Sequence, residues 1–298
     1  MMRREFMAAS IAAAATAAGT RPGPKPAPGD APGPESQDQA TAPTGGGRLK
    51  HSVCQWCFSG MPLEQLAGQA ASMGIASIEL LAPPQWEIIR AHGLVCAVGG
   101  LVPSNPIHSG FNRVENHDAI IRDLETRLPL CREAGVPNQI VMSGNRGGMD
   151  DLEGLRNCAK GLRRITPLAE SLGVTLVMEL LNSKRDHKDY MGDRTRWGAD
   201  LVAQVASPRF KLLYDIYHMQ IMEGDVIATI QEHFDAIAHY HTAGVPGRRE
   251  IDHTQELNYP AICRAIADRG FQGYFAQEFI PSADPMASLR RAIEICTV

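Results

Sequence analysis

The sequence has no hydrophobic run long enough to cross a bilayer and no excess of basic residues. Its apolar stretches are all shorter than the roughly 20 residues that a membrane-spanning helix needs. The 29 lysines and arginines are outnumbered by 33 aspartates and glutamates, which gives a net charge of -4. A dedicated nucleic-acid-binding protein normally carries a basic surface instead. We therefore expect a small-molecule substrate as partner, with no nucleic acid and no stable membrane association.

The cysteines do not form the pattern of a disulfide framework. There are seven, an odd number, scattered over a chain of 298 residues that is long enough to fold around a hydrophobic core. Cys54 and Cys57 have the CxxC spacing of a redox motif or of half a zinc site, but no second CxxC completes a zinc site. The motif also falls within a predicted strand, whereas thioredoxin-type motifs begin a helix. We interpret the cysteines as buried, reduced thiols.

The N-terminal region lacks the alternation of a folded domain. Residues 1–19 contain the paired arginines Arg3 and Arg4, then an alanine-rich stretch and small residues suited to cleavage. This order resembles a bacterial twin-arginine signal peptide and predicts export to the periplasm; without use of the signal, the protein would stay in the cytoplasm. The alternative is a disordered, incidentally basic N-terminus. Residues 20–47 are dense in proline and glycine and bury too little apolar surface to fold, which predicts a disordered linker.

From residue 48 to residue 298 the sequence alternates short apolar segments with longer amphipathic ones. The apolar segments predict strands buried on both faces, over residues 51–58, 75–81, 94–99, 139–143, 175–181, 211–217, 236–242 and 273–279. Helices are predicted between and after them, over residues 62–73, 84–92, 113–134, 151–172, 193–206, 225–234, 255–269 and 285–296. This α/β order, repeated over about 250 residues without a hairpin, predicts a single-domain (β/α)₈ TIM barrel. A doubly wound sheet would normally carry a glycine-rich phosphate turn after its first strand, and this chain has none there.

The last four predicted strands end in residues of the metal-ligand type. In a barrel, functional groups project from the carboxyl ends of the strands. Because side chains alternate along a strand, these residues can all point into the barrel mouth. They are Glu179, Asp215, His241 and Glu278. Any one of them alone would be read as a structural carboxylate or a core histidine, but four at equivalent positions indicate a shared site.

This set of side chains favours a divalent metal ion. Carboxylate oxygens with one imidazole suit Mn²⁺, Mg²⁺ or Co²⁺ better than they suit a thiolate-rich zinc site. The ion would also offset the repulsion among the carboxylates. We expect this ion as the cofactor and no organic cofactor beside it.

Three segments resemble those of a known family. Residues 178–182 (MELLN), 214–220 (YDIYHMQ) and 256–260 (ELNYP) resemble hydroxypyruvate isomerases. These enzymes belong to the xylose-isomerase-like TIM barrels, a superfamily that also contains ketose 3-epimerases and nucleases of the endonuclease IV type. The resemblance extends over nearly everything from residue 51 to the C-terminus. It implies the same barrel fold, whose members commonly associate into homo-oligomers.

The resemblance also implies roles for particular residues. The metal ligands of the epimerase branch are matched by Glu179, Asp215, His241 and Glu278. The substrate-binding positions are matched by His218 and Arg248. Hydroxypyruvate isomerases often have Gln at the position of His241. Epimerases usually have an acidic residue six positions after the first Glu, where this chain has Arg185 followed by Asp186.

The implied reaction is an aldose–ketose type of isomerisation through an enediol, in which hydroxypyruvate becomes tartronate semialdehyde. The metal ion would act as a Lewis acid on the carbonyl and hydroxyl oxygens of the substrate. Glu179 and Glu278 would be the catalytic pair: one removes a proton, and the same or the other residue returns it at the neighbouring carbon. His218 would donate a hydrogen bond to the oxyanion, and Arg248 would pair with a substrate carboxylate.

Other functions are compatible with parts of this pattern. A ketose 3-epimerase or a cyclitol dehydratase would use the same metal and enediol chemistry. Arg248 favours an acidic substrate, but one arginine does not decide between these activities. A nuclease acting at abasic sites would need a multi-zinc cluster with many more histidines, and a basic surface. A non-catalytic sugar-binding barrel would not need Glu179 and Glu278 for proton transfer.

Several further residues near the predicted strand ends have two readings. His187 is either a substrate contact or a solvated loop residue. Trp56 and Phe58 either wall the pocket or pack the barrel. Glu79 is interpreted as a hydrogen-bonding group behind the metal site, and His239 as a core histidine rather than a partner of the site.

Overall fold

The computed structural model describes residues 47–298. The predicted signal peptide, residues 1–19, lies outside the described residues, and so does the predicted linker 20–47 as far as residue 46. Within the described part of the chain, no helix is both long and apolar enough to cross a membrane.

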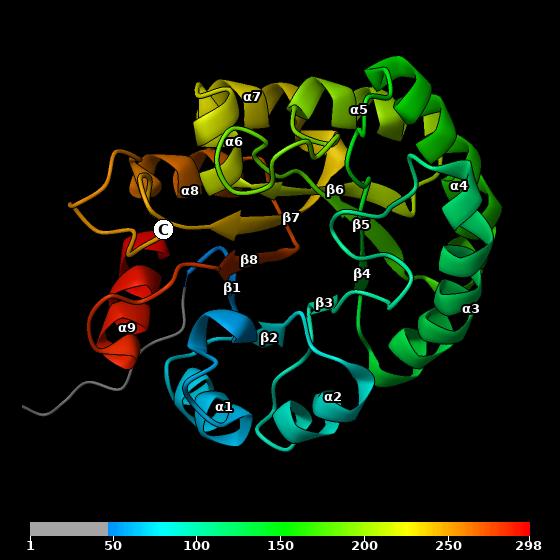
Figure 1. Cartoon of the computed structure of the whole chain (residues 1–298). Coiled ribbons are helices and arrows are strands. Elements are labelled where there is room, and N and C mark those ends of the chain that lie inside the picture. The colour runs from blue at the N-terminus through cyan, green and yellow to red at the C-terminus, as the bar shows by residue number, and fades with distance from the viewer. Residues whose placement is uncertain (1–46) are drawn as a thin grey trace, which may run out of the picture. The chain divides into compact units, whose positions relative to one another are not determined.

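Parallel strands form the centre of the fold (Figure 1). In residues 47–298 they are β1 (Lys50–Cys54), β2 (Ser77–Glu79), β3 (Val98–Gly99), β4 (Asn138–Val141), β5 (Thr175–Glu179), β6 (Phe210–Asp215), β7 (Ile237–Thr242) and β8 (Tyr274–Gln277). Strands that follow one another along the chain pair from β3 to β8, β8 pairs with β1, and β1 pairs with β2. Parallel bridges from Ser77 to Val95 and from Leu81 to Gly99 complete the ring between β2 and β3. The predicted TIM barrel is confirmed.

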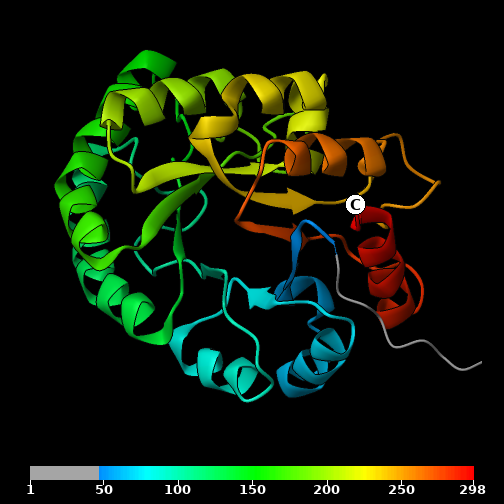
Figure 2. The same cartoon turned by 180° about the vertical axis from the view of Figure 1, so that it is seen from behind.

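Helices cover the outside of the barrel (Figures 1 and 2). They are α1 (Leu63–Ser72), α2 (Pro83–Arg90), α3 (His117–Ala134), α4 (Asp151–Leu172), α5 (Thr195–Val205), α6 (Ile216–Met222), α7 (Val226–His233), α8 (Tyr259–Asp268) and α9 (Pro285–Cys296). Short 3-10 helices lie at Gln55–Phe58, Val114–Asn116 and Phe234–Ala236. A left-handed glycine ends each of the two longest helices, Gly135 after α3 and Gly173 after α4.

Six of the eight predicted strands end earlier than expected, and two of these ends change how the sequence is interpreted. The first ends at Cys54, and the next residues form a 3-10 helix, so the prediction that the CxxC motif lies within a strand is wrong. The sixth ends at Asp215 instead of residue 217, and α6 begins at once. The side chain of Asp215 accepts a hydrogen bond from the backbone N–H of His218 and so caps the new helix. A pattern of apolar residues does not reveal a cap of this kind.

The cysteines, all of which lie in the described part of the chain, are free. They are buried except for Cys57, which is half-buried. Burial raises the pKa of Cys57 above its usual value, so this thiol stays protonated at neutral pH. The interpretation of the cysteines as free thiols is confirmed, with Cys57 less buried than expected.

Alternation along the strands decides which side chains reach the barrel interior. In β6, Leu212 and Tyr214 pack into the core between strands and helices, whereas Leu213 joins a separate cluster inside the barrel. Asp215, two residues after Leu213, therefore points to the interior side at the carboxyl end of the strand. The strand register places Asp215 beside His241 of β7. Neighbouring strand ends thus bring polar side chains to one mouth of the barrel.

The N-terminus of α4 offers a test of the helix boundaries. The side chain of Asp150 accepts hydrogen bonds from the backbone N–H groups of Leu152 and Glu153, at 3.0 and 3.2 Å. Asp150→Ala leaves these donors without their partner, and we expect it to lower the free energy of unfolding by about 1 kcal/mol. The control is Asp200→Ala, which removes an exposed carboxylate paired with Arg196 and should cost less than about 0.5 kcal/mol. Urea unfolding followed by circular dichroism measures both values, and equal losses would contradict the assigned cap.

Candidate active site

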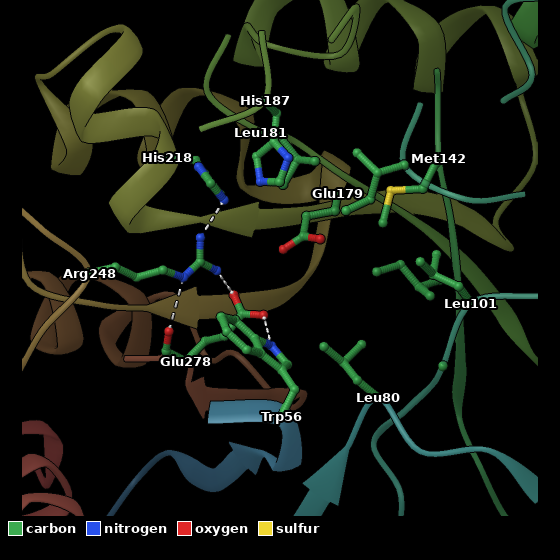
Figure 3. A pocket seen from close by; sticks show the side chains of 13 residues that line it. Trp56, Leu80, Leu101, Met142, Glu179, Leu181, His187, His218, Arg248 and Glu278 are labelled. Carbon is green, nitrogen blue, oxygen red and sulfur yellow. Dashed lines mark hydrogen bonds and ion pairs between the residues drawn. The ribbon is translucent and has the colours of Figure 1, made fainter. Parts of the chain in front are cut away.

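A pocket of about 400 Å³ opens at the carboxyl ends of the strands (Figure 3). Its lining contains charged and aromatic side chains together with apolar ones. The residues with polar groups or rings are Trp56, Glu179, His187, His218, Arg248 and Glu278. Functional groups predicted from several strand ends therefore meet in one concave site.

The predicted metal-binding residues come together in the structure. One donor atom from each lies within 4.8 Å of those of the others, and the residues are Glu179, Asp215, His241 and Glu278. Nδ1 of His241 lies 3.0 Å from Oε1 of Glu179 and 2.9 Å from Oε2 of Glu278. All of these side chains are buried. Strands β5, β6 and β7 contribute one residue each, and Glu278 directly follows β8.

The cluster holds more negative charge than its surroundings stabilise. Burial and the charges of Glu278 and Glu179 raise the pKa of Asp215 to about 8, against the effect of Arg248. Burial acts in the same direction on Glu278, but Arg248 and His241 lower its pKa well below the usual value. For His241, burial opposes the charge, but Cys54, Glu278 and Glu179 raise the pKa well above the usual value. Burial and the neighbouring carboxylates therefore favour the neutral form of Asp215, and a further cation in the cluster would favour its ionised form.

These residues fit a divalent metal ion. Carboxylate oxygens and one imidazole nitrogen form the donor set that Mn²⁺, Mg²⁺ or Co²⁺ takes. An ion between them would supply the positive charge whose lack the raised pKa of Asp215 indicates. Cys54, Glu79 and His241 form a second group with suitable spacing. Burial raises the pKa of Cys54 well above its usual value, and the resulting thiol is a poor ligand.

A buried network behind the cluster fixes the orientation of His241. Nε2 of His241 and Nε2 of His239 each lie 2.8 Å from Oε1 of Glu79. The other oxygen of Glu79 accepts a hydrogen bond from Ser52 at 2.6 Å. Burial opposes the charge on Glu79, but the two histidines lower its pKa to about 2. The ionised Glu79 therefore accepts the Nε2 proton of His241 and turns Nδ1 of that ring toward the cluster.

This network shows what Glu79 and His239 contact, which the sequence left open. Glu79 is a hydrogen-bonding group behind the cluster, as expected. His239 is a buried histidine, as expected, and it also shares the carboxylate of Glu79 with His241. It is a buried partner of the site.

His218 lies beside the cluster in α6 and is fully buried. Its Nδ1 lies 2.6 Å from the side-chain nitrogen of Asn182. Its Nε2 lies 2.8 Å from Arg248 and 3.6 Å from Asp215. Burial and the nearby Arg248 lower the pKa of His218 well below the usual value, so the ring is neutral at physiological pH.

Arg248 reaches the pocket from the segment between β7 and α8. Its guanidinium group pairs with Glu278 and, at 3.3 Å, with Asp215. The same group lies over the rings of Tyr217 and Trp56, at 5.0 and 5.3 Å from their centroids. The structure thus brings Arg248 to the site, with its charge directed at the carboxylates.

The remaining candidates divide between the pocket and the core. His187 and Trp56 line the pocket, and Nε1 of Trp56 donates a hydrogen bond to Glu278 at 2.8 Å. Phe58 is buried, and its ring makes an edge contact with Phe279. Of the two aromatics, Trp56 therefore belongs to the pocket wall and Phe58 to the packing.

Sequence reasoning did not single out Ser52, Asn182 or Tyr217. Ser52 could have been found, because it lies two residues before Cys54 and so shares its inward face in β1. Asn182 donates to Asp186, and the hydroxyl of Tyr217 donates to the same carboxylate oxygen. No periodic signal marks this pair, because both lie beyond the ends of their strands, where the path of the chain is irregular.

Comparison with known proteins places this site in a family. A model of the xylose isomerase-like TIM barrel family matches residues 68–296. The Homo sapiens protein named "Putative hydroxypyruvate isomerase" is 27% identical over 253 residues, which cover 78% of this chain and 90% of that protein. The 2-oxo-tetronate isomerase of Cupriavidus necator is 36% identical over 121 residues, and the match covers 41% of this chain and less than half of that protein, 46%.

A solved structure agrees at the level of the fold. The AP endonuclease, family 2, from Brucella melitensis superposes with a TM-score of 0.71 at 22% identity, over 81% of this chain and 96% of that one. At this identity the likeness concerns the architecture and not the activity. The match to the family model spans most of the chain and contains every residue of the carboxylate cluster. The protein belongs to the xylose isomerase-like TIM barrel family.

Proposed function

We propose that the protein is a metal-dependent isomerase that exchanges the carbonyl and hydroxyl groups of adjacent carbons in a small α-hydroxycarbonyl acid. With the simplest such compound, the reaction interconverts hydroxypyruvate and tartronate semialdehyde. The observation that carries this proposal is the cluster of Glu179, Asp215, His241 and Glu278, whose two glutamates line a pocket that also holds Arg248. The names of the sequence relatives, which are isomerases of hydroxypyruvate and 2-oxo-tetronate, support the same class of reaction.

The metal ion would be held by Glu179, Asp215, His241 and Glu278. When bound, a divalent ion supplies Lewis acidity to the two adjacent oxygens of the substrate. The protein's own contribution is a fixed donor set, because Glu79 orients the ring of His241. Mn²⁺, Mg²⁺ and Co²⁺ are the ions that this oxygen-rich set favours.

Proton transfer requires a carboxylate beside the reacting carbons. Glu278 suits this role because, despite its burial, Arg248 and His241 keep it ionised at neutral pH. Glu179 lines the same pocket. One of them removes the proton from the hydroxyl-bearing carbon, the enediol forms, and the same or the other residue returns a proton to the neighbouring carbon. Substrate and product are isomers, so the reaction needs no redox cofactor.

The hydrogen bonds of His218 affect the tautomer of its ring. The side-chain oxygen of Asn182 accepts from two backbone N–H groups of the following loop, so its NH₂ group is the part that faces Nδ1 of His218. This amide favours Nδ1 as the acceptor and a ring proton on Nε2, whereas the N–H of Arg248, 2.8 Å from Nε2, favours the opposite tautomer. A substrate oxygen that enters between Nε2–H and Arg248 would accept from both, which stabilises the negative charge that develops there.

A ketose 3-epimerase is the second candidate, because His241 is the ligand type of the epimerase branch. Such an enzyme would use the same carboxylates but return the proton to the carbon from which it came. A nuclease is less compatible with the net charge of -4, because phosphate backbones are bound by basic surfaces.

Isotope exchange tests the proposed reaction directly. Hydroxypyruvate is incubated with the protein and Mn²⁺ in deuterated water, and proton NMR follows the loss of the carbon-bound hydrogen signals. We expect deuterium in substrate and product, because a carboxylate that carries the abstracted proton exchanges it with solvent. Chelation of the metal should stop the exchange, and added Mn²⁺ should restore it. A panel of ketoses tests the epimerase alternative, and no exchange with any of these compounds would contradict both.

Glu278→Gln tests the catalytic pair. The amide keeps the size of the side chain but cannot take up a proton, and we expect kcat to fall by roughly 10²–10⁴-fold. Glu294→Gln, on the exposed surface of α9, is the matched control and should leave kcat unchanged. Circular dichroism establishes that both variants are folded. If folded Glu278→Gln had the kcat of the wild type, Glu278 would not be one of the two catalytic glutamates.

Asn182→Asp tests the tautomer of His218. The substitution replaces the NH₂ donor with an oxygen that only accepts, and we expect the ring proton to shift from Nε2 toward Nδ1. Long-range proton–nitrogen NMR of the imidazole distinguishes the two forms. The control is Asn258→Asp, because Asn258 caps α8 through its side-chain oxygen and aspartate can make the same bond. An unchanged His218 tautomer in Asn182→Asp would show that this amide does not set it.

A further inference from the structure

One side of the pocket carries no hydrogen-bonding side chain. Its residues belong to or follow strands β2, β3 and β4, and we call them the apolar wall: Leu80, Leu101, Ile107, Ile140 and Met142. The charged residues of the pocket come instead from the segments that follow or end β5 to β8. Figure 3 shows Leu80, Leu101 and Met142 across the pocket from Arg248. The pocket thus has a charged end and an apolar end.

Gly100 also lines the pocket, beside the apolar wall. Its backbone N–H and C=O are both already hydrogen-bonded within the protein. Its N–H donates to the carbonyl of Leu81 at 2.9 Å. Its carbonyl accepts from Arg127 at 2.9 Å and from Gln139 at 3.0 Å. A substrate hydroxyl beside Gly100 would therefore find no free backbone partner there and would lose hydrogen bonds to water without replacement.

Leu80 keeps an apolar side chain in the pocket despite an unfavourable backbone conformation. Its φ is 61°, in the left-handed region that leucine rarely adopts. Pairing between β2 and β3 holds it there, because the N–H of Leu80 donates to the carbonyl of Val98 and Leu81 bridges to Gly99. Glycine or asparagine would adopt this conformation at lower cost. Strained residues of this kind concentrate at functional sites.

The mouth of the pocket exposes apolar surface to water. Leu101 and Trp56 are 39% and 41% exposed, and both line the pocket. Burial of such surface by a ligand is favourable in proportion to the apolar area covered. A compound that covers Leu101 gains binding energy that a small polar acid cannot reach.

We propose that the substrate is an α-hydroxycarbonyl acid with an apolar substituent, an unbranched alkyl chain of a few carbons, next to the reacting carbons. This inference rests on the proposed isomerase function and specifies its substrate class. The carboxylate pairs with Arg248, the reacting carbons lie at Glu179 and Glu278, and the substituent extends to the apolar wall. A pocket of about 400 Å³ has room for such a chain beyond the three carbons of hydroxypyruvate.

The reaction converts R–CH(OH)–CO–COO⁻ into R–CO–CH(OH)–COO⁻, where R is the substituent. The carbon beside R loses its hydrogen as a proton, and the carbon–carbon double bond of the enediol forms. A proton is then added to the carbon beside the carboxylate, and the hydroxyl proton passes from one oxygen to the other. The atoms balance without an oxidant or reductant. In hydroxypyruvate R is hydrogen, which leaves the apolar wall uncovered.

A matched pair of substrates tests the proposal. The compounds with R as ethyl and R as hydroxymethyl have the same number of heavy atoms and differ in one methyl for one hydroxyl. We expect kcat/KM for the ethyl compound to be higher by about tenfold or more, because the hydroxyl loses its hydrogen bonds at the apolar wall. From methyl to ethyl to propyl, kcat/KM should rise about fourfold for each added CH₂. Equal or better turnover of the hydroxymethyl compound would overturn the proposal.

A pair of leucine variants locates the effect. Leu101→Ser introduces a hydroxyl into the apolar wall and should lower the ethyl-to-hydroxymethyl ratio of kcat/KM by about fivefold or more. Leu152→Ser changes a leucine on α4 that is 63% exposed and does not line the pocket, and it should leave the ratio unchanged. If Leu101→Ser and Leu152→Ser had the same ethyl-to-hydroxymethyl ratio of kcat/KM, the apolar wall would not be the cause of the preference for ethyl.

Calorimetry with unreactive acids separates this inference from the proposed function. The 2-oxo acids R–CH₂–CO–COO⁻ lack the hydroxyl group that isomerisation needs, and they report binding alone. Tighter binding of the alkyl acids without deuterium exchange in any α-hydroxycarbonyl acid would refute the isomerase and retain the ligand class. Exchange with hydroxypyruvate but no preference for alkyl over hydroxyalkyl groups would refute the apolar substituent and retain the isomerase.

Discussion

Buried negative charge at the barrel mouth is the constraint on which the site depends. Several carboxylates in one buried cluster are unfavourable unless nearby positive charge and hydrogen bonds offset the loss of hydration. The chain supplies His241 and Arg248 for this purpose, and the raised pKa of Asp215 indicates that they do not suffice. The parallel strands of a barrel end at similar heights, so the fold itself gathers these groups. This gathering of carboxylates is what would make a further cation in the cluster favourable.

The same constraint explains the residues behind the cluster. His241 presents Nδ1 to the carboxylates because Glu79 holds the opposite side of its ring. Glu79 remains ionised inside the barrel because His239 and Ser52 also bond to its oxygens. A buried polar network is stabilising only when each member has its partners. The orientation of the His241 ring therefore depends in part on Ser52 in β1, at the far side of this four-residue network.

Much of this arrangement is predictable from sequence because alternation along a strand is a local property. Alternation and the position at strand ends group Glu179, Asp215 and His241, and the structure has their donor atoms within 4.8 Å. The start of α6 was not predictable, because it depends on a side-chain cap and not on apolar periodicity. The link between His239 and the site was not predictable, because its partner, Glu79, is 160 residues away in the sequence. A histidine on the inward face of a strand gives the same sequence alternation whether it only packs in the core or also forms a hydrogen bond to a distant carboxylate.

The division of the pocket limits what family membership implies about the substrate. The segments that carry the resemblance, residues 178–182, 214–220 and 256–260, lie in the β5-to-α8 part of the barrel, which supplies most of the charged end. The apolar wall comes from β2 to β4, where none of these segments lies. Under the proposed function, the residues for the reaction and those that contact the substituent would come from different parts of the chain. In the proposed function, the charged end would carry the proton transfer, and the residues around Leu80 and Leu101 would decide which substituent the acid carries.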